Sequence, residues 1–228
     1  MSVRDISWRG EHLLPHPLRT TGPTSAKRYT VLPPTNVNAI SVHHTTGIGL
    51  PASSTVAQEI TYLRAIDAYH RLRRGLDAIG YQLVAFASGR VYVTAPLDRY
   101  GAAVGGQNNH TISVALPGDF STKPPSPGHL RAAATAVAHV DAYLGRKVAV
   151  RPHYYWGRTA CPGRTYATWA AQLRPFATRY HTVVHGDTAW GIAVARRISL
   201  ARLKALNPSG PRSGDWDLIY PGERLRVA

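Results

Sequence analysis

The chain has 228 residues, a formal net charge of +15 and 44% hydrophobic residues. This length and apolar content allow one or two folded domains and exclude a disordered chain. No apolar run approaches the roughly 20 residues that a transmembrane helix requires, and no hydrophobic segment follows Met1. We therefore expect no membrane insertion and no signal peptide, so the protein should be made in the cytoplasm.

The positive charge favours a polyanionic partner, and most of the excess lies before residue 180. Nucleic acid, anionic lipid and an anionic cell wall all fit this charge, as does an arginine-rich solvated surface. The single cysteine, Cys161, excludes a disulfide within the chain. It leaves three roles for this residue: a buried apolar side chain, a nucleophile or a metal ligand.

Residues 1–175 show strands that alternate with helices. Residues 1–38 are rich in Pro, Thr, Arg and Gly, and they predict an irregular lead-in. Apolar runs predict strands at residues 39–43, 81–86, 90–94, 111–116 and 147–151, the second and third of which form a hairpin. This alternation is typical of an α/β domain.

Helix boundaries in this domain are marked by capping residues. Thr55 and Gln58 are spaced as a capping box, and Ser126 followed by proline is suited to begin a second helix that Gly145 ends. A last helix should carry Trp169, Leu173 and Phe176.

A second, smaller domain is expected at residues 180–228, after a short linker at 176–179. Its pattern is βααβ, with strands at 181–184 and 224–227 and helices at 188–197 and 199–206. Asp187 and Ser199 are suitable N-caps for these two helices.

Three residues in the larger domain have side chains that suit a zinc ion. His43 ends the first strand, His153 follows the strand at 147–151, and Cys161 comes eight residues later. Imidazole nitrogen and thiolate sulfur are ligands that zinc prefers, and catalytic zinc takes three protein ligands and one open position. Spacing alone leaves a structural role open, because the chain has 11 histidines and a lone buried cysteine is usually inert.

Four segments occur in the order found in one family of enzymes. They are Val42-His43-His44-Thr45-Thr46-Gly47, Gly80-Tyr81, residues 108–114 and residues 153–163. Over residues 36–175 the chain resembles the zinc amidases of the peptidoglycan-recognition and phage-lysozyme-type family. The resemblance implies a mixed central sheet flanked by helices, and a zinc ion held by His43, His153 and Cys161.

The same resemblance implies the reaction and the catalytic residues. The expected reaction is hydrolysis of the amide between N-acetylmuramic acid and L-alanine, with zinc activating water and polarising the carbonyl. Tyr81 matches the family's catalytic tyrosine. Thr159 stands where some amidases have lysine and others threonine, and it is expected to donate a second hydrogen bond to the oxyanion.

The chain departs from its relatives at two positions that concern proton transfer. Ala115 stands where some relatives have glutamate, and Ala103 where some have histidine. The general acid or base therefore remains open, with His44 and Arg158 as nearby candidates that are also expected to contact substrate. Three further residues match a substrate-contacting loop of the family, but they fit an ordinary polar turn equally well: Asn108, Asn109 and His110.

Residues 180–228 resemble a LysM domain over its full length, including His185-Gly186-Asp187-Thr188 and Tyr220-Pro221-Gly222. LysM domains bind glycans that contain N-acetylglucosamine, between the loop after the first strand and the loop after the second helix. The residues expected in these loops are Gly186, Asp187, Thr188, Asn207 and Pro208. An amidase joined to a LysM domain implies a bacteriophage endolysin: a monomer made in the host cytoplasm that acts on peptidoglycan after release.

Three alternatives compete with this interpretation. A non-catalytic peptidoglycan-recognition protein has the same fold but typically lacks the zinc cysteine, so Cys161 and Tyr81 favour an enzyme. A glycosidase usually needs two carboxylates, but the larger domain has only Glu11 and Glu59 as glutamates, and no pair is suggestively placed. A nucleic-acid binder is not favoured, because no helix-turn-helix, RNP or zinc-finger pattern occurs.

Overall fold

A computed structural model of the chain describes residues 3–15, 30–174, 180–196 and 198–227. The chain divides into two compact units, Met1–Arg174 and Pro175–Ala228. The linker predicted at residues 176–179 lies outside the described residues. Among the residues that are described, no helix is long and apolar enough to cross a membrane.

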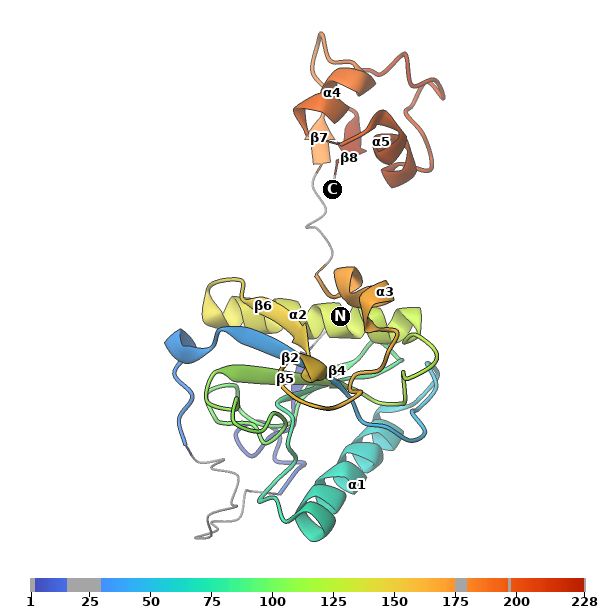
Figure 1. Ribbon diagram of the computed structural model, residues 1–228. Helices are drawn as coiled ribbons and strands as arrows, with labels where there is room; N and C mark the ends of the chain where they lie inside the picture. The colour runs from blue at the N-terminus through green and yellow to red at the C-terminus, as the bar shows by residue number, and fades with distance from the viewer. Residues whose placement is uncertain (1–2, 16–29, 175–179, 197, 228) are drawn as a thin grey trace. The chain divides into compact units, whose positions relative to one another are not determined.

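The larger unit is built on one six-stranded mixed sheet (Figure 1). Its strands, in spatial order, are β1 (Val3–Asp5), β4 (Val91–Val93), β3 (Leu83–Ala85), β5 (Thr111–Leu116), β2 (Ala39–His44) and β6 (Ala149–Pro152). Only β3 and β4 pair antiparallel, as the predicted hairpin, and all the other neighbours are parallel. The α/β class with a mixed central sheet is thus confirmed.

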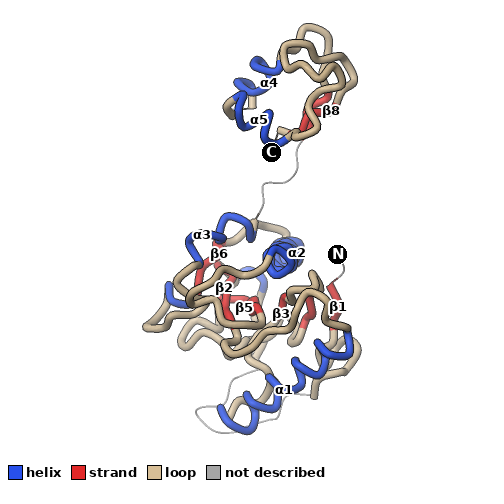
Figure 2. Tube along the Cα trace, turned by 90° about the vertical axis from the view of Figure 1, so that its right-hand side faces the viewer, coloured by secondary structure: helices blue, strands red, loops and turns tan. Residues whose placement is uncertain are grey.

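Helices cover both faces of this sheet (Figures 1 and 2). Helix α2 (Pro127–Leu144) and the short α3 (Tyr166–Trp169) lie on one face, and α1 (Val56–Arg74) lies on the other. Successive strand residues point to opposite faces, so Val91 and Val93 join the core under α2, whereas Tyr92 joins the core under α1. Two apolar layers therefore hold the sheet in place.

The predicted helix boundaries of α1 and α2 are confirmed. The Thr55 side chain accepts from the Gln58 backbone N–H and the Gln58 side chain accepts in return, which completes a capping box. Ser126 caps α2. Gly145 ends it in the left-handed conformation, with a φ of 64° that suits glycine.

Two parts of this unit differ from the prediction. Within the segment expected to be irregular, Val3–Asp5 forms β1, which pairs with Val91–Val93 at the edge of the sheet. A three-residue strand is too short to show the alternation from which strands are predicted. The last predicted helix is α3 followed by a 3₁₀ turn, Ala170–Leu173, and Phe176 lies outside the described residues.

The smaller unit has the predicted βααβ order. A two-stranded antiparallel sheet, β7 (Tyr180–Thr182) and β8 (Arg224–Arg226), accompanies α4 (Ala189–Ala195) and α5 (Leu200–Leu206). These elements share a small apolar core made of Val183, Ala189, Ile192, Ala193, Leu203, Leu225 and Val227.

One capping prediction in this unit is wrong. Thr188, not Asp187, is the N-cap of α4, and its side chain accepts from the Gly191 N–H. The Asp187 carboxylate is engaged elsewhere, since it lies 2.6 Å from the His181 ring and accepts from the Val184 N–H. The predicted N-cap Ser199 does begin α5.

A buried carboxylate, Glu59, ties α1 to the hairpin. Its side chain is fully shielded from solvent and accepts hydrogen bonds from Ser54, Ser88, Arg90 and Tyr92 at 2.6 to 2.7 Å. Burial alone would raise the pKa of Glu59, but the hydrogen bonds from Arg90 and the three hydroxyls outweigh burial and hold the pKa below its ordinary value.

We expect Glu59→Gln to destabilise the protein at neutral pH by roughly 2–4 kcal/mol, because an amide N–H₂ then faces groups that donate. A carboxylate with a depressed pKa stabilises the fold above its unfolded pKa, and this stability is lost as the pH falls through the folded pKa. Urea unfolding should therefore show a large difference between variant and wild type at pH 7 and a smaller one near pH 3. The matched control is Glu11→Gln in the exposed Arg4–Glu11 pair, which should change stability little. Equal effects of the two substitutions at pH 7 would contradict this prediction.

Candidate metal centre and its pocket

Two parallel strands bring the first pair of candidate ligands together. His43 is near the end of β2, and His153 directly follows β6. The register pairs Val42 with Pro152, so the residues that follow them, His43 and His153, lie side by side. The centroids of the two imidazole rings are 4.6 Å apart.

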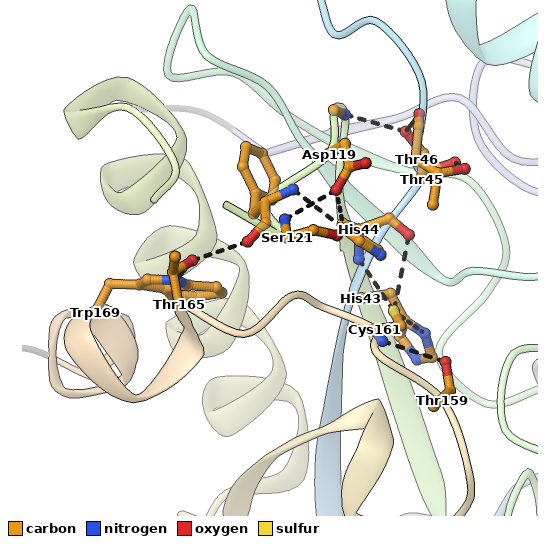
Figure 3. A network of polar contacts seen from close by, with 12 residues as sticks. His43, His44, Thr45, Thr46, Asp119, Ser121, Thr159, Cys161, Thr165 and Trp169 are labelled. Atoms are coloured by element: carbon orange, nitrogen blue, oxygen red, sulfur yellow. Dashed lines mark hydrogen bonds and ion pairs between the residues drawn. The ribbon is translucent and has the colours of Figure 1, made fainter. Parts of the chain in front are cut away.

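Cys161 reaches the same place through a loop that folds back on the strand ends. The Tyr154 N–H donates to the Cys161 carbonyl at 2.9 Å, and the His44 N–H donates to the Cys161 Sγ at 3.3 Å. The sulfur lies 3.7 Å from His43 Nδ1, and Figure 3 shows Cys161 beside His43 in this network of polar contacts. One ligand atom from each of His43, His153 and Cys161 lies within 4.8 Å of the others.

The chemistry of this donor set fits zinc. Burial, reinforced by the neighbouring His153, holds the pKa of His43 well below its ordinary value, and burial also lowers the pKa of His153. Both rings are therefore neutral at pH 7 and offer a lone pair. Burial raises the pKa of the Cys161 thiol to about 12, although the His44 N–H opposes this. A cation must displace that proton to bind, and two nitrogens with one thiolate are ligands that zinc prefers.

These candidate ligands lie in an open pocket of about 760 Å³. Tyr81 also lines it, just before β3, with its ring centroid 5.4 Å from that of His43. Burial, reinforced by Cys161, raises the pKa of Tyr81 well above its ordinary value, so the phenol keeps its proton. The arrangement places a hydrogen-bond donor beside a site for a cation.

Two further predicted residues, Thr159 and His44, also line the pocket. Thr159 Oγ1 accepts from the Cys161 N–H at 3.2 Å, so its own O–H remains available to donate. The Nδ1 of His44 accepts from the Phe120 N–H at 3.2 Å. Burial lowers the pKa of His44, an effect that nearby Asp119 only partly offsets.

Both units of the chain match known protein families. Residues 33–164, more than half of the chain, match the N-acetylmuramoyl-L-alanine amidase family, and residues 181–228 match the LysM domain. The chain belongs to the N-acetylmuramoyl-L-alanine amidase family. The match of the smaller unit to LysM indicates that peptidoglycan is the partner.

Individual relatives agree with this assignment. The chain is 30% identical over 144 residues to peptidoglycan-recognition protein SC2 of Drosophila simulans, covering 57% of this chain and 74% of the relative. It is 28% identical over 148 residues to an N-acetylmuramoyl-L-alanine amidase of Sus scrofa, covering 60% of this chain and 25% of that protein. The solved amidase LysC from Clostridium intestinale URNW shares the fold, with a TM-score of 0.52, 19% identity, and coverage of 76% of this chain and 97% of LysC.

Four residues predicted to contact substrate in this amidase-family unit do not line the pocket. Arg158 is exposed on the loop before Cys161. Asn108 Oδ1 accepts from the Ala103 and Val104 N–H groups, so it shapes a loop whose Ala103 does line the pocket. Asn109 is exposed, and the ring of His110 contacts Gln107 Oε1. Their predicted contacts with substrate stay predictions.

Helix α1 contributes a pocket wall that our sequence analysis missed. The side chains that line it follow a helical spacing of three and four residues: Tyr62, Ile66, Tyr69, His70 and Arg74. His70 Nδ1 accepts from the Gly80 N–H at 3.0 Å, and its ring packs 5.5 Å from that of Tyr81. Among the described residues that line the pocket, Arg74 is the one with a permanent charge. The aromatic and basic residues spaced along one side of α1 are the signal that would have identified this wall.

The LysM residues predicted to bind glycan split into two groups. Gly186, Thr188 and Pro208 are exposed. By contrast, the Asp187 carboxylate is held by His181, and the Asn207 side chain makes three hydrogen bonds to the backbone of Leu203 and Arg226. Asp187 and Asn207 therefore shape the two loops, and glycan contact by any of the five remains a prediction.

Proposed function

We propose that the chain is a zinc-dependent N-acetylmuramoyl-L-alanine amidase that cleaves bacterial peptidoglycan. The observation that carries this proposal is the convergence of His43, His153 and Cys161 beside Tyr81 in one open pocket. Peptidoglycan recognition without catalysis is the alternative, and it does not require a partly buried set of two imidazoles and a thiol next to a protonated phenol.

In this proposal His43, His153 and Cys161 hold the zinc ion. When bound, zinc supplies a Lewis acid that polarises the scissile carbonyl and makes water a better nucleophile. The oxygen of water bonds to the lactyl carbonyl carbon, and the bond from that carbon to the nitrogen of L-alanine breaks. The products are a lactyl carboxylate on the muramic acid and a free α-amino group on the peptide.

The remaining pocket residues act on the substrate through hydrogen bonds. Tyr81 keeps its proton because of its raised pKa, and it donates to the oxygen on which negative charge develops. Thr159 has its own O–H free to donate to the same oxygen. His44 is assigned to positioning rather than to proton delivery, because its Nδ1 already accepts a backbone N–H and its pKa is lowered.

Mass spectrometry of digested peptidoglycan tests the bond that is cut. We expect peptides that begin with a free L-alanine amine, together with glycan strands that carry unsubstituted lactyl groups. New reducing ends on the glycan would indicate a glycosidase instead. Binding to peptidoglycan with no released peptide, by protein loaded with zinc, would indicate a recognition protein and would sink the proposal.

We further propose a bacteriolytic role of the endolysin type, made in the host cytoplasm and acting after release. The support is the combination of an amidase-family unit with a LysM unit in one chain. Expression inside a bacterium should cause lysis once the inner membrane is permeabilised, and a Cys161→Ser variant should not. Absence of lysis by the active enzyme in permeabilised cells would argue against this role.

The LysM unit should act as an anchor that raises the local concentration of substrate without altering the chemistry. A truncated protein that ends at Arg174 retains the whole larger unit and should fold. We expect truncation to slow lysis of intact walls by about tenfold or more, and to leave hydrolysis of a small soluble muropeptide nearly unchanged.

The basic larger unit can also be attracted to anionic walls by its charge. High salt weakens this attraction but affects glycan contacts less, so salt distinguishes it from anchoring by the LysM unit. Rates should therefore be compared on walls and on soluble substrate at low and high salt. Equal rates of the two proteins on walls at high salt would show that LysM is not the anchor. An equal loss on both substrates would show that the two units depend on each other.

A further inference from the structure

A buried hydroxyl lies directly behind one of the proposed zinc ligands. Ser41 and His43 are two residues apart on β2, so their side chains point to the same face of the sheet. Ser41 is fully shielded from solvent, and its Oγ lies 2.7 Å from His43 Nε2. The other ring nitrogen, Nδ1, lies 3.7 Å from Cys161 Sγ and thus faces the metal cluster.

A neutral imidazole carries its proton on one nitrogen and a lone pair on the other. His43 can bind a cation toward Cys161 only if Nδ1 holds the lone pair, which requires the proton to be on Nε2. In that tautomer Nε2–H donates to Ser41 Oγ, whereas in the opposite tautomer Nδ1–H blocks the cation. We propose that Ser41 is a positioning residue of the metal centre, which holds the His43 ring in the orientation that binds zinc and accepts from Nε2–H when Nδ1 binds the ion.

The chain contains a matched control for this hydroxyl. Ser113 on β5 is the register partner of Ser41, so it lies on the same face of the sheet, and it is 1% exposed. Its Oγ has no hydrogen-bond partner among the described residues. Ser41→Ala and Ser113→Ala are therefore the same chemical change at adjacent buried positions, and only Ser41→Ala removes a contact to a proposed zinc ligand.

The test measures zinc affinity by competition with a chelator at equilibrium, in the full-length protein. Partners of metal-binding histidines typically contribute about 10–100-fold in affinity, so Ser41→Ala should weaken zinc binding by that factor. Ser113→Ala should stay within about threefold of wild type, and Ser41→Thr, which keeps the hydroxyl, should retain most of the affinity. Equal affinities of Ser41→Ala and wild type, or an equal loss in both alanine variants, would overturn the proposal.

A second measurement needs no substitution. Nitrogen-15 NMR of the histidine rings in the zinc-loaded wild type should show the His43 proton on Nε2, with Nδ1 bound to the metal. A proton on Nδ1 would overturn the inference even if the variants failed to fold. The inference rests on the proposed zinc site, but the two can be refuted separately. If wild type binds no zinc, both are refuted. If wild type binds zinc and Ser41→Ala binds it with equal affinity, only the role of Ser41 is refuted.

Discussion

Replacing Cys161 with serine should abolish wall lysis while leaving the protein folded and able to bind the wall. A serine hydroxyl is a far poorer zinc ligand than a thiolate, so two imidazoles would remain as the protein ligands. Losing a residue that only hydrogen-bonds a metal ligand typically weakens metal binding by up to about 100-fold. Because Cys161 is itself a proposed ligand, we expect zinc affinity to fall by more than that. Hydrolysis should slow by roughly 10³-fold or more, as when one member of a catalytic unit is removed.

The pH dependence of zinc binding tests whether the thiol is a ligand. Burial raises the pKa of Cys161 to about 12, so zinc must displace one proton from it near neutral pH, whereas the pKa values of His43 and His153 are lowered. Wild-type zinc affinity should therefore rise about tenfold per pH unit between pH 7 and 9, and the variant should lose this dependence.

A thermal unfolding profile like that of zinc-free wild type serves as the folding control for the larger unit, and retained binding to purified walls shows that the separate LysM unit is intact. Undiminished lysis by Cys161→Ser that contains no zinc would contradict the metal mechanism.

The residues of the proposed zinc site and most of the secondary structure can be predicted from the sequence because their signals are local. Residues 39–43 form an apolar run that ends on histidine, and a strand end is a rigid point from which to present a ligand. The capping box at Thr55 and the Gly145 stop depend on contacts within one helical turn, so residue type and spacing suffice to predict them.

The assembly of the site depends on pairing that no local pattern encodes. His43 and His153 meet because Val42 is in register with Pro152, across more than 100 residues of sequence. The same limit applies to β1, whose three residues become a strand only through β4. The N-cap of α4 was misassigned because two neighbouring residues both carry a suitable oxygen, and the contact of Asp187 with His181 decides between them.

Removing the Tyr81 hydroxyl should slow catalysis without removing the metal. Tyr81→Phe deletes one oxygen and little volume, and the ring can keep its packing 5.4 Å from His43 and 5.5 Å from His70. If the phenol stabilises the developing oxyanion, kcat should fall by on the order of 10²–10³, the usual effect of losing one such donor. KM should change little, because the contact is made mainly in the transition state.

Tyr166→Phe provides the control for this change. Tyr166 is also a tyrosine whose pKa burial raises, to about 12, but it does not line the pocket. We expect its kcat to match wild type, with one zinc ion per chain in all three proteins. The raised pKa of Tyr81 adds a second expectation: because the phenol stays protonated, kcat should not decline up to about pH 10, where an ordinary tyrosine ionises. An unchanged kcat in fully metallated Tyr81→Phe would show that the hydroxyl does not support the transition state, and Thr159 would then be the next side-chain donor in the pocket to test.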